Sequence, residues 1–338
     1  MSPFTPGKLL QLRASLSAHP DQEVLRTYFK GTSGSPLCSA VLVTLHRKWS
    51  AHAPYRLTSL GITTYTRGSS TTSTGVPPTA GPHAENILRE LWCLHLVIRP
   101  FAHLDSTASG LAPFHFGHTV YVSPAEALDM LSAIWHQPID EQHPKQGFRP
   151  IVYMSFGDND SLGKMRRPAF DFDPATVDTT VATLDAQIIP QQAKITRHAD
   201  ASLDYLLLQF QVPVFHQENA GNAAVYAAVA AVLSALRVDL YASAKNAAAK
   251  PGRSGQSSGK EAGEVVQGLM DWPTPAPPWG VDVYCWRCGS GEHGFGECEM
   301  EEEEEGEGEV GCGKCRVSNQ QWRRENAGTH VEGLCSFR

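Results

Sequence analysis

Apolar residues recur along the first two thirds of the chain in two kinds of pattern. Short runs rich in β-branched and aromatic residues predict buried β-strands, whereas apolar residues spaced three and four positions apart predict helices. The predicted strands cover residues 39–49, 56–66, 150–156 and 181–189, and the predicted helices cover part of residues 1–35, a segment that begins at Ser123, residues 201–210 and residues 220–236. Strands that alternate with helices over residues 36–241 predict a three-layer α/β domain.

The helix that begins at Ser123 has the strongest local signal. Ser123 can cap the helix, Pro124 suits its first position, and Glu126 can bond back to the capping residue. Residues 84–98, in contrast, mix the two patterns, and residues 68–82 are so rich in Ser, Thr, Gly and Pro that they predict a loop.

Changes in composition predict further segments on both sides of this domain. Residues 247–263 are rich in Gly, Ser and Lys, and residues 273–278 are rich in proline, which together indicate a linker. The predicted boundaries are 1–35 for a helical lead-in, 36–241 for the α/β domain, 242–280 for a flexible linker, 281–299 for a first cysteine-rich segment, 300–309 for an acidic spacer and 310–338 for a second cysteine-rich segment.

The net charge of −7 comes from one short segment. Nine glutamates lie between Glu297 and Glu309, without any Lys or Arg, and the rest of the chain is close to neutral. Bulk charge therefore does not identify a nucleic-acid-binding protein. No apolar run approaches the roughly 20 residues that span a bilayer, and residues 1–13 lack a signal core. We therefore expect an intracellular protein without a membrane partner, in the nucleus or the cytoplasm.

Six of the eight cysteines lie between Cys285 and Cys335, and clustered cysteines in a reducing compartment are more often metal ligands than disulfides. The first cluster has the spacing C-x2-C-x4-H-x4-C and resembles a retroviral-type zinc knuckle. Four thiolate and imidazole ligands suit tetrahedral Zn²⁺, and neighbouring glycines let a short chain wrap the ion. The predicted ligands are Cys285, Cys288, His293 and Cys298.

Knuckles of this type also carry two exposed aromatic residues that stack on unpaired bases. Trp286 and Phe295 resemble this pair, and Arg287 could contact a phosphate. Glu292 replaces the glycine that usually precedes the histidine, and the glutamates that follow would repel phosphates. A purely structural zinc site, or a disulfide pair, is the alternative.

The second cluster has the spacing C-x2-C-x14-H-x4-C and repeats the two ends of the first. We expect a second zinc site there, whereas the alternative is a loose tail with two spare cysteines. Several Lys and Arg residues and Trp322 accompany it. The predicted ligands are Cys312, Cys315, His330 and Cys335.

The α/β domain also resembles a known superfamily. Residues 41–49 and 57–65 resemble the opening hairpin of DEDD-type 3′–5′ exonucleases, which have a ribonuclease-H-like fold. Residues 203–210 and 218–226, with the run Asn-Ala-Gly-Asn, resemble the last motif of that superfamily. The whole chain most resembles ribonuclease-H-like proteins of fungi that also carry C-terminal CCHC zinc knuckles. The resemblance implies a three-layer domain with a mixed sheet, followed by small zinc-knuckle modules.

The resemblance also implies four carboxylates that hold two divalent cations, but most of them are missing here. The acids of the first motif align with His46 and Lys48, and the histidine and aspartate of the last motif align with Glu218 and Ala223. Asp160 fits the middle acid, although a solvated turn residue is the alternative, as is a surface role for His46 and Lys48. Further carboxylate candidates are Asp158, Asp178 and Asp185.

A lysine at a metal-ligand position repels Mg²⁺, and one aspartate cannot hold two hard cations. The sequence therefore favours a pseudo-nuclease that keeps the fold, binds zinc, and contacts single-stranded nucleic acid, RNA rather than DNA. The ribonuclease-H-like domain would serve as scaffold or as surface for a protein partner. Two alternatives stay open: an active metal-dependent 3′–5′ exonuclease, and a protein-interaction module in which zinc only folds the tail.

Overall fold

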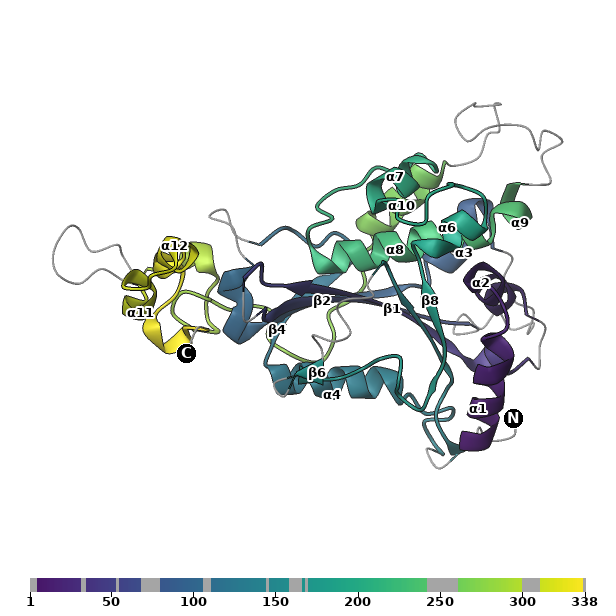
Figure 1. Ribbon diagram of the computed structural model, residues 1–338, viewed down its shortest axis with the longest axis horizontal. Coiled ribbons are helices and arrows are strands. Elements are labelled where there is room, and N and C mark those ends of the chain that lie inside the picture. Colours follow the sequence, from purple (N-terminus) through teal and green to yellow (C-terminus); the bar gives the residue numbers. More distant parts are fainter. Residues whose placement is uncertain are drawn as a thin grey trace.

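The computed structural model describes residues 5–31, 35–52, 55–67, 80–105, 111–143, 146–157, 166–167, 170–241, 261–299 and 311–336. A six-stranded sheet forms the middle layer, with helices on both faces (Figure 1). The strand order is β4-β3-β2-β1-β5-β8. These strands are β1 (Val41–Trp49), β2 (Leu57–Thr66), β3 (Trp92–Ile98), β4 (His118–Val122), β5 (Ile151–Ser155) and β8 (Thr180–Asp185), and β6 (Arg166–Arg167) and β7 (Phe170–Asp171) form a separate pair.

The sheet is mixed, as predicted. β1, β2 and β3 form an antiparallel meander, whereas β4, β5 and β8 each pair in parallel with a neighbour. Most residues of β1 and β2 are buried on both faces of the sheet. This explains why their sequences read as nearly continuous apolar runs rather than as alternating patterns. The prediction of strands at 39–49 and 56–66 is confirmed.

Helix α8 (Ala220–Ala235) covers one face of the sheet and packs against β1, β2 and β3. All of its residues are buried, and its many alanines let the helix approach the sheet closely. At Gly61 in β2 the approach is so close that a β-carbon would collide with the Ala220 carbonyl group. Further helices pack around α8: α2 (Asp21–Lys30), α6 (Ile188–Gln192) and α7 (Leu203–Leu208).

Helix α4 (Pro124–Trp135) covers the opposite face. Its start confirms the local prediction, because Ser123 and Glu126 form a capping box and Pro124 occupies the first turn. Trp135 at its end is fully buried, and its indole N–H donates to the Pro174 carbonyl and the Thr180 hydroxyl.

Both edges of the sheet are covered, which protects unpaired backbone groups from a second chain. Helix α1 (Pro6–Leu16) packs along β8 at one edge. At the other edge, Val281 forms two backbone hydrogen bonds with Tyr121 of β4, at 2.8 and 3.1 Å. The predicted helical lead-in is therefore part of the domain core, since the Tyr28 hydroxyl in α2 donates to the carbonyls of Ala40 and Tyr65.

Two predictions of local structure need correction. Part of the expected flexible linker, residues 242–280, is helix α10 (Ala262–Asp271), whose Val265 and Val266 are buried in the core. The glycine-rich composition hid a capping box formed by Glu261 and Glu264. The expected strand 181–189 ends at Asp185, and α6 follows.

The remaining helices are short. They are α3 (Glu85–Leu88), α9 (Arg237–Tyr241), α11 (Gly313–Arg316) and α12 (Gln321–Glu325). Helices α11 and α12 belong to the cysteine-rich end of the chain, which lies at the opposite end of the molecule from α1 and α2 (Figure 1). The acidic segment 300–310 and the central residues of the linker lie outside the described residues.

Candidate functional site

The sequence aligns the acids of the first motif with His46 and Lys48, which lie in β1. His46 is paired with Gly61 across β1 and β2, and Gly61 faces the first residues of α8. Because side chains alternate along a strand, Lys48 lies on the same face as His46. Both residues therefore lie on the sheet face that α8 covers.

Lys48 has a carboxylate partner that the sequence did not indicate. Its ammonium group forms an ion pair with Asp105, whose side chain is only 3% exposed, after the 3-10 segment η3 (Arg99–Leu104). The Ser59 hydroxyl in β2 donates to the same carboxylate at 2.8 Å. A lysine cation therefore neutralises the buried carboxylate here, on the sheet face that α8 covers.

The start of α8 is held by asparagine side chains. Asn219 caps the helix by accepting from the amides of Gly221 and Asn222, at 2.8 and 3.2 Å. Its own amide group donates to the Ala112 carbonyl at 2.8 Å, and that of Asn222 donates to Pro113 at 2.9 Å. The Asn-Ala-Gly-Asn run thus binds residues 112–115 across the helix start.

The sequence aligns the last motif with Glu218 and Ala223, which lie around the start of α8. Ala223 is buried in α8 and offers only a methyl group. Glu218 lies just before the helix, and its carboxylate bonds to His216 at 3.0 Å. A backbone hydrogen bond, assisted by His216 and Lys48, lowers the pKa of Glu218, so the carboxylate stays ionised.

His95 is a further buried residue at this place that the sequence did not indicate. It lies opposite Gly61 on β3, and its Nδ1 is 3.0 Å from the Thr119 hydroxyl and 3.3 Å from the Asn219 amide. Burial, with a smaller effect of Lys48, lowers the pKa of His95 to about 3. The imidazole is therefore neutral near pH 7 and adds no positive charge.

The remaining carboxylate candidates differ in whether the structure describes them and in what they contact. Asp160 and Asp158 lie outside the described residues. Asp185 accepts from the amides of Gly157 and Gln187, at 3.0 and 2.8 Å, and so fixes the loops that follow β5 and β8. Asp178 is an exposed residue 3.5 Å from His136.

The first predicted zinc-ligand set is brought together. One ligand atom from each of Cys285, Cys288, His293 and Cys298 lies within 4.8 Å of all the others. The turn that presents them is closed by the Gly289 amide, which donates to the Cys285 carbonyl at 2.7 Å, and Gly289 has a positive φ of 83°. Three thiols and one imidazole at this spacing fit tetrahedral Zn²⁺.

The second set, Cys312, Cys315, His330 and Cys335, is brought together within the same limit and is fully buried. The Cys315 sulfur lies 3.7 Å from both the His330 Nε2 and the Cys335 sulfur, so these cysteines are not joined as a disulfide. This set also fits Zn²⁺, and the long spacing before His330 accommodates α12.

The three residues predicted to contact nucleic acid form one stack. Trp286 lies parallel to Phe295, with ring centroids 4.8 Å apart, and the Arg287 guanidinium lies 5.1 Å from the Phe295 centroid. Trp286 is only 5% exposed, because it packs against Val97 of β3 and Ala102 of η3. In this arrangement the indole contacts protein, which does not favour its predicted role as a platform for a base.

The two cysteine-rich segments contact each other and the domain. The Val331 amide donates to the Arg287 carbonyl at 3.1 Å, which joins the two segments. The Ser336 hydroxyl donates to the Pro100 carbonyl at 2.9 Å, and the His330 and His103 rings lie 4.2 Å apart. Both segments therefore pack against η3.

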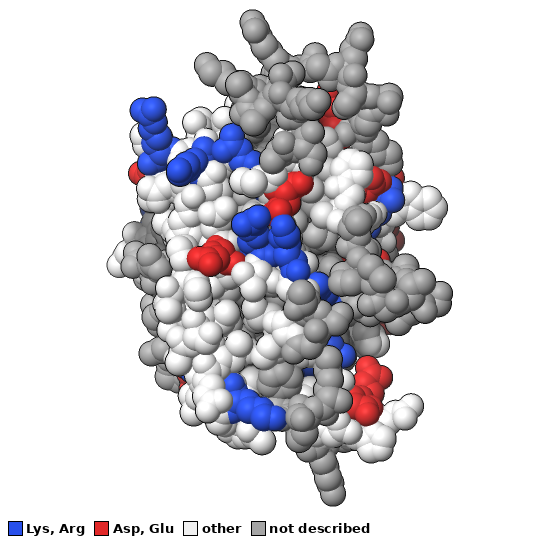
Figure 2. All heavy atoms as spheres, turned by 90° about the vertical axis from the view of Figure 1, so that its right-hand side faces the viewer, with Lys and Arg blue, Asp and Glu red and all other residues white. Residues whose placement is uncertain are grey.

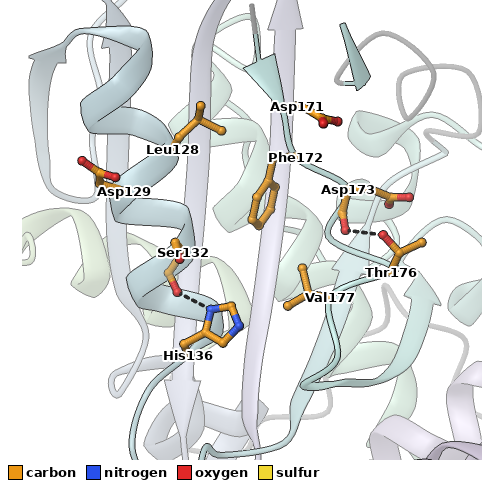
Figure 3. A pocket seen from close by; sticks show the side chains of 9 residues that line it. All are labelled: Leu128, Asp129, Ser132, His136, Asp171, Phe172, Asp173, Thr176 and Val177. Carbon is orange, nitrogen blue, oxygen red and sulfur yellow. Dashed lines mark hydrogen bonds between the residues drawn. The ribbon is translucent and has the colours of Figure 1, made fainter. Parts of the chain in front are cut away.

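A groove of about 570 Å³ lies on the other face of the sheet, between α4 and residues 171–177 (Figure 3). Its lining includes Asp129, Asp171 and Asp173 beside the apolar Phe172 and Val177. The sheet separates this groove from His46 and Lys48, and the aspartates of the groove would repel a phosphate backbone.

The mixed sheet with α8 packed across β1, β2 and β3 defines a ribonuclease-H-like domain of the exonuclease type. Residues 41–234 match the family model DEDDh_C, described as DNA polymerase III subunit epsilon-like, C-terminal domain. Since this is more than half of the chain, the protein belongs to that family. No curated protein matches the sequence. Among the described residues, no helix is long and apolar enough to cross a membrane.

Proposed function

We propose that this protein binds single-stranded nucleic acid, RNA rather than DNA, and that its exonuclease-like domain no longer cleaves it. The DEDDh_C family match supports contact with nucleic acid, and the ion pair between Lys48 and Asp105 is the observation that carries the loss of cleavage. A fixed ammonium group repels Mg²⁺, and Ala223 offers no ligand at the last-motif position.

The two Cys/His sets support zinc as the resident metal. Zinc would be held by Cys285, Cys288, His293 and Cys298, and by Cys312, Cys315, His330 and Cys335, where it would fold the tail against the domain. The free thiols support an intracellular location, in the nucleus or the cytoplasm. The exonuclease-like domain would serve as scaffold, with a surface for a protein partner.

The test uses the full-length, zinc-loaded chain and a 5′-labelled 20-nucleotide RNA. We expect the RNA to be bound but not shortened in the presence of Mg²⁺ or Mn²⁺. Shortening that is abolished by Asp160→Asn would instead establish an active exonuclease. Absence of binding would leave a zinc-folded protein-interaction module as the better account.

A further inference from the structure

The tail offers a second set of basic and aromatic side chains, apart from the zinc-knuckle stack. Helix α12 lies against the turn between β1 and β2, where the Trp322 and His52 rings stack with centroids 4.6 Å apart and nearly parallel planes. The Arg323 guanidinium lies 5.4 Å from the Trp322 centroid. One element of the tail and one of the domain therefore build this surface together.

The described part of the turn adds an arginine and an exposed aromatic ring. Arg56 is positioned by its backbone, which forms hydrogen bonds with Ser50, and its guanidinium lies 5.4 Å from the Phe101 centroid in η3. Tyr55, the residue before Arg56, is 41% exposed. We call the set His52, Tyr55, Arg56, Trp322, Arg323 and Arg324 the turn–α12 surface.

Two of the arginines on this surface are not paired with a carboxylate among the described residues. Arg324 is exposed and donates to the Ser318 carbonyl, and neither Arg324 nor Arg56 has a carboxylate partner among the described residues. Glu325 of the same helix accepts from the Gln321 side chain at 2.8 Å.

At the opposite end of the molecule, basic and acidic side chains lie next to one another (Figure 2). There, Arg26 and Lys30 of α2 both bond to Asp239. A phosphate backbone would have to compete with that carboxylate, whereas at the turn–α12 surface it would meet Arg56 and Arg324, which have no carboxylate partner among the described residues.

We propose that single-stranded nucleic acid binds across the turn–α12 surface, an inference that rests on the proposed nucleic-acid-binding function. Arg56, Arg323 and Arg324 contact phosphates, and Tyr55 stacks on a base. Arginine and aromatic side chains in one surface are the combination that binds single strands with little sequence preference. Trp286 of the first cysteine-rich segment packs against β3 and η3, so it is not offered to a base. The proposed surface is built instead by the second cysteine-rich segment and the turn between β1 and β2.

The experiment measures the fluorescence anisotropy of a labelled 12-nucleotide oligouridine with the full-length, zinc-loaded chain at several salt concentrations. The double variant Arg56→Gln/Arg324→Gln is compared with Lys194→Gln/Arg197→Gln, which removes two exposed charges from the loop after α6. We expect the first variant to bind about tenfold more weakly and its salt slope to fall by about 1.4, which corresponds to two phosphate contacts. The control should bind like the unmodified chain.

The Tyr55→Ala variant should weaken binding about fivefold or more without changing the salt slope, because stacking releases no counterions. Zinc content and thermal unfolding are measured for each variant to confirm that it is folded. If the unmodified chain does not bind the oligonucleotide, the proposed function itself fails. If it binds, and Arg56→Gln/Arg324→Gln keeps both affinity and salt slope, the function stands and the turn–α12 surface is wrong.

Discussion

At the scale of single residues, Lys48 places a cation on the sheet face that α8 covers. That cation is bound to the Asp105 carboxylate, which the Ser59 hydroxyl also supports. The carboxylate is almost inaccessible to water, so it depends on this partner more than a surface aspartate would.

The first prediction concerns this ion pair. Lys48→Met keeps the length of the side chain but leaves Asp105 buried without its counter-charge, so we expect a loss of about 2–3 kcal/mol in the free energy of unfolding. This is somewhat below the usual cost of breaking a buried pair, because Lys48 is 32% exposed. Urea unfolding of Lys48→Met and of the unmodified chain measures this loss. The double variant Lys48→Met/Asp105→Asn should recover most of the loss; equal stability of Lys48→Met and the unmodified chain would contradict the assignment.

The second prediction follows from the lowered pKa of His95. The unfolded chain takes up a proton near pH 6.5, whereas the folded chain does so only near pH 3. Stability contributed by the neutral imidazole is therefore fully present above pH 6.5 and is lost as the pH falls towards 3, by up to about 1.4 kcal/mol per pH unit. Comparing urea unfolding of His95→Gln and the unmodified chain between pH 7 and pH 4 measures this. Parallel curves would show that His95 is not buried as a neutral group.

At the scale of elements, helix α8 determines how the domain is packed. Its alanines and its asparagine cap allow it to lie directly on β2 and β3, with Phe114 against Gly221. A β-carbon at Gly221 would lie 2.7 Å from the Phe114 ring, so glycine is required there by space rather than by backbone angle. The same reason applies to Gly61.

The third prediction tests this close packing. Gly61→Ala places a methyl group against the backbone of Ala220, which cannot rotate away, so we expect a loss of about 3 kcal/mol or more in unfolding free energy. Gly268→Ala in α10 is the matched control, because it has open space around its β-carbon and should gain about 0.5–1 kcal/mol from helix propensity. Similar losses in both variants would indicate a general effect of glycine replacement.

The sequence predicted correctly those helices and strands that are specified by residues within the element itself. The capping box at Ser123 and the apolar runs of β1 and β2 are of this kind. The short strand β4 was missed, because its pairing with β3 and Val281 is a tertiary property. The overextended strand 181–189 has a physical cause, since Asp185 accepts two backbone amides and so ends β8 within an apolar run.

In the candidate site, too, features set by local spacing could be predicted, whereas features set by tertiary contacts could not. Both Cys/His sets that could hold a metal ion were identifiable from the sequence, because metal ligands follow characteristic spacings along the chain. Asp105 could not be predicted, since its pairing with Lys48 depends on how η3 folds back over β2. The environment of Trp286 could not be predicted either, because a base-stacking aromatic and a packing aromatic look alike in sequence.

At the scale of the whole molecule, the cysteine-rich segments are packed onto the exonuclease-like domain. Trp286 covers Val97 and Ala102, Ser336 bonds to Pro100, and Trp322 stacks on His52. The fourth prediction is that loss of the second zinc site loosens η3, which these contacts hold.

The variant Cys315→Ser tests this, with Cys38→Ser as the control because Cys38 belongs to neither ligand set. We expect Cys315→Ser to lose one zinc ion per chain and to show faster amide hydrogen exchange over residues 99–104, since zinc binding supplies folding free energy. Cys38→Ser should keep both ions and normal exchange. Unchanged protection of residues 99–104 after zinc loss would show that the tail does not stabilise the domain.

The most direct test of the central claim is a metal analysis of the full-length chain after dialysis against buffer that contains Mn²⁺ as a substitute for Mg²⁺. The claim is that the tail holds zinc whereas the exonuclease-like domain no longer holds catalytic cations. We expect two zinc ions and no manganese per chain. Two manganese ions per chain, or a tail without zinc, would contradict it.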